Sequence, residues 1–331
     1  MFRVISRLLA VLALLLIGAV IFAEVRTRRG AREAEAELAA YDPAPIDDFS
    51  TTSSLSILPL IDWHTSSSDL ATEMGVSYLI ETDEHRILFD VGQNTLQESP
   101  SPLERNMEAL GVAIDSIDTL FISHNHFDHV GGRPNQENQT FSIGLDPVPL
   151  PGLRAFVPIP MSYPGLEPIH SPDPVLIGQG VASTGTIPRQ LVFGWIDEQA
   201  LVVHVEGRGA VLVVGCGHQT VSELLKRYDR VFDIPLYGVV GGLHFPVPNG
   251  RLKVLGLNGQ RILASGKGML APMTMDDVKA DLAELQKRGL GLIGVGGHDS
   301  SDEVITMFAQ AFGNAYRQVR VGKRIVVGPP N

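Results

Sequence analysis

The sequence contains little cysteine and is short of positive charge. Cys216 is the single cysteine among 331 residues, so no disulfide can form within the chain, and the thiol content defines no redox compartment. The 37 acidic side chains outnumber the 26 lysines and arginines, which leaves a formal net charge of −11. Such an acidic chain is poorly suited to binding nucleic acid over a broad surface. We therefore expect a small molecule, and no nucleic acid, as its partner.

The longest stretch without charge lies near the N-terminus. Leu8–Ala23 is uncharged over sixteen residues and follows Arg3 and Arg7. The apolar part of a secretory signal has about 7–15 residues and a membrane-spanning helix needs about 17–25, so this run falls between the two. A cleavage site after Ala23 would need a small residue where Ile21 stands. We therefore favour an uncleaved, single-pass anchor in the cell membrane over a removed signal.

A polar segment follows the anchor. We assign residues 1–28 to the anchor (or signal), 29–54 to a helical stalk and a Pro-, Asp- and Ser-rich linker, and 55–331 to one folded domain. With 44% hydrophobic residues the chain can bury a full core. Basic residues flank both ends of the apolar run, so the positive-inside rule favours neither face, and an extracytoplasmic domain is one of two alternatives. No oligomeric state is predicted.

Four metal-ligand side chains occupy six consecutive positions. They are His124, His126, Asp128 and His129, and they follow the apolar run 118–123, which predicts a buried strand. Neutral imidazole suits zinc, iron and manganese. A solvated polar turn is the plain alternative, but the cluster lies between a strand and a Gly-Gly pair that permits a sharp turn. The spacing indicates two metal ions side by side.

Three later histidines and one earlier aspartate are placed at the ends of apolar runs. His218, His244 and His298 each come after such a run and a glycine. Each of them alone is explained as a packed core histidine, but together with the first cluster their shared placement favours metal ligation. Asp90 ends another apolar run directly before a Val-Gly pair, where a buried carboxylate would need a partner.

The motif His-x-His-x-Asp-His followed by Gly-Gly resembles the signature of the metallo-β-lactamase superfamily. The resemblance implies an α/β fold, the four-layer αβ/βα metallo-β-lactamase sandwich, here with an N-terminal transmembrane helix in front of it. The ligand sets are then His124, His126 and His218 for one metal, and Asp128, His129 and His298 for the other. Asp90 would support the metal loop, and His244 would lie near the substrate or act as a variable ligand. Asp128, Asp90 and His244 are the predicted catalytic residues.

Further phrases resemble one subgroup, the 7,8-dihydropterin-6-methyl-4-(β-D-ribofuranosyl)aminobenzene-5′-phosphate synthase-like proteins. They are Glu73–Ser77, Thr184–Arg189, Asp197–Leu201, Gly215–His218 and Gly241–His244. Two features depart from the subgroup. The run His298-Asp299-Ser300-Ser301 stands where the subgroup has His-Cys-Thr-Gly, and residues 246–273 are inserted after His244.

We expect a membrane-anchored dinuclear metal-dependent hydrolase or related transferase that uses a metal-bound hydroxide on a small, anionic substrate. Zinc is the first choice for the two divalent ions, with iron and manganese as alternatives. Two other functions stay open: a metal-binding sensor or binding protein without turnover, and an iron-dependent oxidoreductase on the same fold. The intact ligand set speaks against the sensor.

Two Pro- and Gly-rich segments are expected near the substrate. Residues 134–189 lack long periodic runs and are predicted to line the entrance. Residues 246–275 carry Arg251, Lys253, Arg261 and Lys267 and no acidic residue. We predict a mobile lid that closes on the anionic substrate. The alternative is a patch that lies on anionic lipid beside the anchor.

Overall fold

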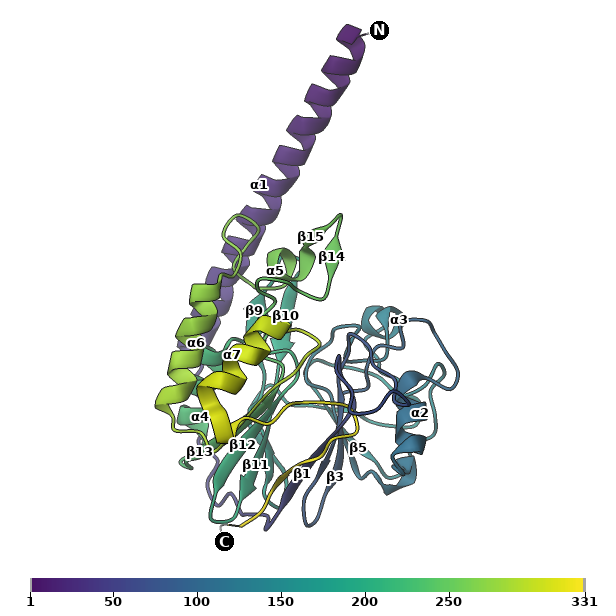
Figure 1. The fold of residues 1–331 in the computed structure, drawn as a ribbon, viewed down its shortest axis with the longest axis vertical. Helices are drawn as coiled ribbons and strands as arrows, with labels where there is room; N and C mark the ends of the chain where they lie inside the picture. Colours follow the sequence, from purple (N-terminus) through teal and green to yellow (C-terminus); the bar gives the residue numbers. More distant parts are fainter. Residues whose placement is uncertain (1, 330–331) are drawn as a thin grey trace.

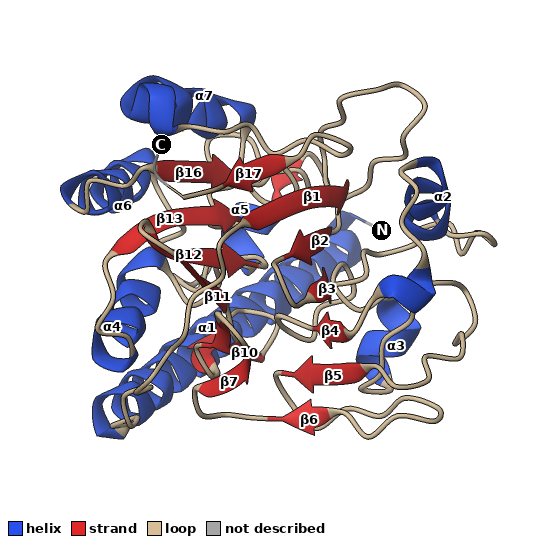
Figure 2. Cartoon of the chain, turned by 90° about the horizontal axis from the view of Figure 1, so that it is seen from below, coloured by secondary structure: helices blue, strands red, loops and turns tan. Residues whose placement is uncertain are grey.

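Two β-sheets lie face to face at the centre of the molecule (Figures 1 and 2). The structure, a computed structural model, describes residues 2–329. The first sheet contains β1 (Leu55–Ile61), β2 (Ser77–Glu81), β3 (Arg86–Phe89), β4 (Thr119–Phe121), β5 (Arg154–Val157), β6 (Ile169–His170) and β17 (Ile325–Val327). The second contains β7 (Val175–Gly178), β8 (Val181–Ser183), β11 (Leu201–Val205), β12 (Gly209–Val214), β13 (Leu236–Gly241) and β16 (Leu292–Val295). Two short ribbons pair β9 (Ile187–Gln190) with β10 (Trp195–Glu198), and β14 (Lys253–Val254) with β15 (Leu257–Asn258).

Helices cover the outer face of each sheet. The helices of the described residues are α1 (Phe2–Ala40), α2 (Pro102–Ala109), α3 (Arg133–Glu137), α4 (Val221–Val231), α5 (Gly259–Leu263), α6 (Met275–Lys287) and α7 (Asp302–Phe312), with 3₁₀ turns at Ile114–Ser116 and Gly313–Ala315. Figure 2 shows α2 and α3 beside the first sheet and α4, α6 and α7 beside the second. The strand orders are β17-β1-β2-β3-β4-β5-β6 and β16-β13-β12-β11-β8-β7. This arrangement confirms the predicted four-layer αβ/βα sandwich.

Three apolar layers hold the sandwich together. Between the sheets, the stacked rings of Phe89 and Phe121, with centroids 5.4 Å apart, share one buried cluster with Val213 of the second sheet. A second cluster lies between the second sheet and α4, α6 and α7, and a third lies between the first sheet and α2. The central strands β12 and β13 are buried along almost their whole length, which explains why they are continuously apolar in the sequence.

The starts of two helices agree with the sequence. The hydroxyl of Ser101 accepts the N–H of Glu104, whose carboxylate accepts the N–H of Ser101 at 2.7 Å. Thr274 and Asp277 make the same reciprocal pair at the start of α6. These pairs satisfy N–H groups that have no partner inside the helix, so each helix begins at a defined residue. Helix α2 then leads the chain into β4, the strand before the histidine cluster.

Residues 134–189 are more regular than the sequence predicts. They contain five strands, β5 to β9, each only two to four residues long. Strands β5 and β6 extend the first sheet, and β7 and β8 begin the second, so the segment carries the chain from one sheet to the other. Strands this short show no readable period, so the sequence alone predicts an irregular segment.

Helix α1 continues without a break beyond the predicted anchor. Its first half is exposed and apolar, with a mean hydropathy of 2.8 over 18 residues, so it is long and apolar enough to cross a membrane. Its second half packs on the domain. Thr27 and Ala34 are buried, and Gly30 lies so close to Gln190 of β9 that an added Cβ would be 2.2 Å from its Oε1. The predicted stalk, residues 29–54, therefore lies against the domain instead of standing clear of it.

The segment inserted after His244 folds into the β14–β15 hairpin and α5. Three of its four cations contact the protein. Arg251 bonds the carbonyl of Gly297 and Asp302, Arg261 bonds the carbonyl of Met273, and Lys267 pairs with Asp277. These contacts occupy most of the charges that a lid would offer to an anionic substrate.

Candidate metal centre

Three histidine ring nitrogens converge at the end of β4. Nε2 of His124 lies 3.1 Å from Nδ1 of His126, which lies 3.2 Å from Nε2 of His218. Two nitrogen ligands at about 2.0–2.1 Å from one tetrahedral zinc ion are about 3.3 Å apart, so the observed spacing fits a shared metal. His124 and His218 are buried and His126 is half-buried. The structure thus brings together the three residues predicted as the first ligand set.

The second predicted set lies beside the first. Nε2 of His129 is 3.7 Å from Oδ2 of Asp128, and the rings of His129 and His298 are 5.4 Å apart. Sγ of Cys216 lies 3.4 Å from Nε2 of His298, and it also lies within 4.8 Å of ligand atoms of His124 and His129. Cys216 therefore stands between the two sets.

Parallel strands explain why distant residues meet. Strands β3 and β4 are parallel neighbours, and so are β12, β13 and β16. The carboxyl ends of parallel strands lie at the same edge of a sheet. Asp90 and His124 follow β3 and β4, and His218, His244 and His298 follow β12, β13 and β16. The two edges touch at Gly215, where an added Cβ would be 2.1 Å from Oγ of Ser123.

Asp90 holds the loop of the first cluster. Its carboxylate accepts the N–H and the hydroxyl of Ser123 and the Nδ1–H of His129, each at 2.7 Å. With Nδ1 engaged, Nε2 of His129 faces the centre, which is the orientation that a carboxylate partner gives a metal-binding histidine. The structure thus joins Asp90 to both Ser123 and His129, at the two ends of the loop of the first cluster.

Three other buried carboxylates hold the loops of the second sheet. Glu198 accepts the N–H groups of Cys216, Gly217 and His218 at 2.8–2.9 Å. Separate acids hold the other two loops: Asp62 accepts the N–H of Gly297 at 2.8 Å, and Asp299 accepts the N–H of His244 at 2.8 Å. Each loop that carries a candidate ligand is therefore fixed by an acid from another strand end.

Burial sets the protonation of the histidines. It lowers the pKa of His126 and the pKa of His244 to about 3, and it lowers the pKa values of His124, His218 and His298 as well. Burial also acts to lower the pKa of His129, but Asp90 and Asp128 beside it raise that pKa to about 9. Five of the six rings are thus neutral at pH 7, and neutral imidazole is the form that binds metal.

Several of these rings lack the partners that packed core histidines have. Among residues 2–329, Nε2 of His129, Nδ1 of His298 and both ring nitrogens of His244 are buried without a hydrogen-bond partner. Buried polar atoms in folded proteins are nearly always paired. A set of imidazole, carboxylate and thiol donors with unpaired nitrogens fits a divalent cation such as zinc.

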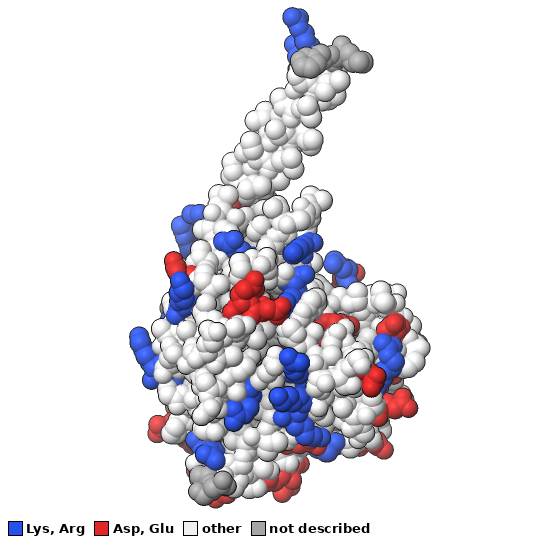
Figure 3. Space-filling model, in the orientation of Figure 1, with Lys and Arg blue, Asp and Glu red and all other residues white. Residues whose placement is uncertain are grey.

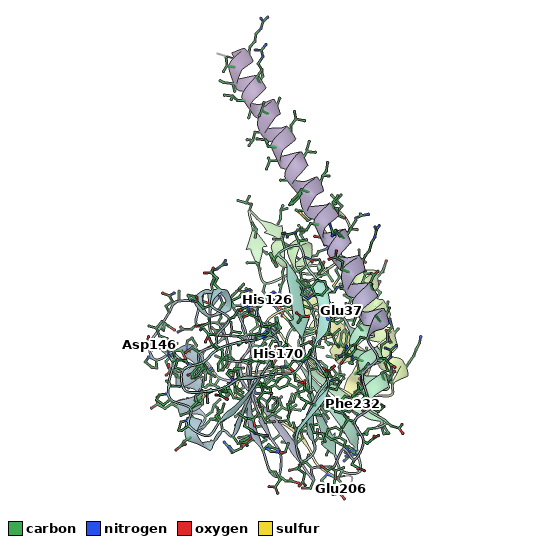
Figure 4. All side chains as sticks on the ribbon, turned by 180° about the vertical axis from the view of Figure 1, so that it is seen from behind. Glu37, His126, Asp146, His170, Glu206 and Phe232 are labelled. Atoms are coloured by element: carbon green, nitrogen blue, oxygen red, sulfur yellow. The ribbon has the colours of Figure 1, made fainter. Side chains whose placement is uncertain are left out.

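A cavity of about 270 Å³ opens onto this centre. Five of its lining residues come from the centre: His126, Asp128, Cys216, His218 and His244. The others are Met74, Phe127, Arg133, Gln136, Phe193, Leu252, Gln260 and Ala264. Figure 4 shows His126 in the part of the domain from which α1 projects. The structure places His244, one of the predicted catalytic residues, in the wall of this cavity.

Sequence reasoning missed four residues of the centre: Cys216, Glu198, Asp62 and Asp299. A signal existed for Asp62, which follows the apolar strand β1 just as Asp90 follows β3. Cys216 and Glu198 each lie in a phrase that resembles the subgroup, Gly215–His218 and Asp197–Leu201. The role of Glu198 is not visible there, because its three backbone partners are defined only by the folded loop.

Comparisons with known proteins agree with this fold. Residues 71–134 match the model of the metallo-β-lactamase superfamily. The chain is 23% identical over 305 residues to 7,8-dihydropterin-6-methyl-4-(β-D-ribofuranosyl)-aminobenzene-5′-phosphate synthase of Methanocaldococcus jannaschii, which covers 80% of this chain and 93% of that protein. Its solved neighbours include a metal-dependent hydrolase of the β-lactamase superfamily, with a TM-score of 0.54, 18% identity and coverage of 83% of this chain and 99% of that one. Another is the metallo-β-lactamase fold protein YhfI from Bacillus subtilis, with a TM-score of 0.50, 12% identity and coverage of 83% and 100%.

The chain has the metallo-β-lactamase fold, which is the fold of a superfamily of metal-dependent enzymes. The predicted resemblance to the superfamily, and to the dihydropterin-ribofuranosyl-aminobenzene-phosphate synthase within it, is confirmed.

Proposed function

We propose that this chain is a membrane-anchored, dinuclear metal-dependent hydrolase or related transferase that acts on a small, anionic substrate. Its main support is the convergence of His124, His126 and His218, with His129, His298 and Cys216 beside them. Several of the buried ring nitrogens have no partner among residues 2–329. When bound, two divalent cations would acidify a water molecule and polarise a carbonyl or phosphoryl group. Zinc is the first choice because imidazole, carboxylate and thiol donors together suit it.

The protein's own residues would hold and orient this centre. His124, His126 and His218 would hold one cation, and Asp128, His129 and His298 the other, with Cys216 between them. The bond from His129 to Asp90 fixes the direction of its ring. The N–H groups of residues 216–218 bind one carboxylate, Glu198, so Cys216 and His218 keep a fixed position relative to each other. Such pre-set ligands need no rearrangement when metal or substrate binds.

His244 would contact the substrate. It lines the cavity, its ring is 4.4 Å from that of His218, and neither of its buried nitrogens has a partner within the described chain. Because its pKa is about 3, the ring is neutral at pH 7 and can donate one hydrogen bond and accept another. It can equally serve as a variable ligand of the adjacent cation.

Two observations support an anionic substrate: the positive charge of Arg133 at the cavity, and the name of a similar archaeal protein. Arg133 is exposed at the cavity wall, 5.6 Å over the ring of Phe127. The similar archaeal protein is named as a synthase of a 5′-phosphate compound. That name also supports group transfer as an alternative to hydrolysis.

The direct test is to purify the chain without added metal, measure its metal content, and screen phosphodiesters, lactones and thioesters. We expect about two divalent ions per chain and turnover of one class, lost in the Asp128→Ala variant. Bound metal without turnover of any class would favour the sensor, and tightly bound iron with redox activity would favour the oxidoreductase.

A further inference from the structure

Exposed apolar side chains gather where α1 leaves the domain. Leu255 is 98% exposed, Leu257 64% and Leu270 65%. Figure 1 shows the β14–β15 hairpin and the loop after α5 rising beside α1 toward the same end of the molecule. Single exposed leucines are ordinary, but three on one segment, at the end of the domain from which an exposed apolar helix projects, call for an explanation.

The backbone conformation at the tip of the hairpin is unfavourable for a leucine. Leu255 and Gly256 form the two-residue turn between β14 and β15, with φ of 51° and 80°. A turn with both φ values positive favours Asn-Gly, and a leucine there is strained. Because Leu255 is almost fully exposed, packing within the domain does not offset the strain. A contact outside the domain would explain the choice of residue.

The helix leaves no spacer between a bilayer and this surface. Residues 4–23 of α1 are largely exposed, and twenty helical residues span about 30 Å, the thickness of a hydrocarbon core. The next residue, Glu24, is buried and accepts the N–H of Met269 at 2.9 Å. The loop that carries Leu270 is thus fastened to the helix at the end of its apolar part, where the headgroups would begin.

The charges around this surface suit an anionic lipid rather than an apolar protein groove. The segment 246–275 has four cations and no acid. Arg251 and Lys267 pair with Asp302 and Asp277, and on α1 Arg28 and Arg29 pair with Glu24 and Glu33. Within residues 2–329, the cations without an acidic partner include Lys253 and Arg261 of the segment and Arg26 of the helix. Figure 3 shows the projecting helix free of charged side chains along its shaft, with Lys and Arg as well as Asp and Glu on the part of the domain beside it. Apolar side chains flanked by cations are typical of segments that lie in the headgroup region.

We propose that Val254, Leu255, Leu257 and Leu270 insert into the headgroup region of the bilayer that α1 crosses. The same segment contributes Leu252, Gln260 and Ala264 to the wall of the metal-site cavity. Insertion of its tip therefore holds the cavity mouth against the membrane surface. This inference rests on the membrane anchor of the proposed function and not on turnover.

The test uses the full-length chain in vesicles of phosphatidylcholine and phosphatidylglycerol. Leu255→Cys is labelled with an environment-sensitive fluorophore, and a lipid with a nitroxide near its carbonyl groups serves as quencher. The chain without an added cysteine is the labelling blank, since Cys216 is buried. Val326→Cys is the matched control, because Val326 is 66% exposed and lies near the C-terminus, which Figure 1 places at the opposite end.

We expect several-fold stronger lipid quenching at position 255 than at 326. Equal quenching at both positions would overturn the inference. So would shielding of the 255 label from aqueous iodide without lipid quenching, because a second copy or another protein would then cover the tip. A chain that leaves the vesicles would overturn the anchor as well, whereas absence of turnover leaves this readout unchanged.

A second variant separates lipid contact from a structural role of the leucine. Leu255→Asn supplies the residue that the turn favours, so we expect an unchanged or higher Tm. In a chain labelled at Leu257→Cys, it should reduce lipid quenching several-fold, while Leu96→Asn, a change at a residue that is 78% exposed, should not. Quenching that is insensitive to Leu255→Asn would contradict insertion of the tip.

Discussion

The two sheets contribute to the candidate centre in different ways. The first sheet places four candidate ligands on one loop after β4, within six positions. The second sheet supplies His218, His244 and His298 from the ends of three separate strands. The first pattern is visible as local density in the sequence, whereas the second becomes meaningful only when β12, β13 and β16 are known to be parallel neighbours.

The supports of the ligands differ in the same way. In the first sheet, Asp90 alone holds both the start of the loop and the ring of His129. In the second, Glu198, Asp299 and Asp62 each hold one loop. Dispersed ligands thus need one buried acid apiece, because no shared loop fixes them relative to one another.

The largest expected effect comes from removing one ligand of each kind. His126→Ala and His218→Ala should each abolish activity and lower the metal content, because both nitrogens belong to one set. The measurements are kcat/KM on the substrate found by the screen, metal per chain, and Tm.

The control for the ligand variants is His170→Ala, which changes an exposed histidine on β6 and should alter none of the three quantities. If the His218 variant keeps full metal content and rate while the His126 variant loses both, only the dense loop binds metal.

The next effect compares the supporting acids. Asp90→Asn and Glu198→Gln should each cost about 10- to 100-fold in metal affinity or activity, the usual range for residues that orient ligands. An amide keeps the size but offers one acceptor oxygen, whereas Glu198 receives three N–H groups. Competition with a chelator measures the affinity. Glu206→Gln, on the surface, is the control, and an unchanged Glu198→Gln variant would show that the second-sheet loops hold themselves.

A smaller effect concerns α1, whose packing on β9 should stabilise the domain. A chain that starts at residue 41 lacks α1, and we expect its Tm to fall by roughly 4–8 °C. A loss of about 2 kcal/mol in the free energy of unfolding shifts the Tm of a domain of this size by about that much. A chain that starts at residue 23 keeps the packed half of α1 and should keep its Tm. Equal Tm values for the two chains would show that α1 adds no stability to the domain. That result would agree with the prediction of a separate stalk before a domain that begins at residue 55.

The smallest effect distinguishes two basic side chains, one on α3 and one on the β14–β15 hairpin. Arg133→Ala should raise KM for an anionic substrate by about tenfold, equivalent to 1.4 kcal/mol, because its charge lies at the cavity. Lys253→Ala should leave the kinetics in detergent solution unchanged, because Lys253 lies on the exposed hairpin. A raised KM in the Lys253 variant would support the mobile lid predicted from the sequence.

The sequence predicted the parts of the molecule that rest on local rules. Strand β1, the caps of α2 and α6, and the cluster around His126 follow from apolar runs, capping residues and ligand density. The short strands between residues 154 and 190 escaped because each is too brief to show a period. The roles of Glu198 and Cys216 in the centre were not predicted, because they depend on which strand ends meet. Only the order of strands in the sheets defines that. The packing of α1 on the domain was not predicted, because Gly30 and Ala34 are ordinary helix residues in the sequence. Their contact with the domain is visible only in the structure.

The contacts of α1 also fix the orientation of the domain relative to this helix. Arg26 bonds the carbonyl of Val192, Glu24 binds the loop before α6, and Gly30 sits against β9, so α1 and the domain move as one body. A helix that crosses a bilayer adjusts its tilt to the thickness of the hydrocarbon core. Without a swivel between helix and domain, each change of tilt would turn the cavity by the same angle. The thickness of the surrounding membrane would then determine the direction in which the metal site opens.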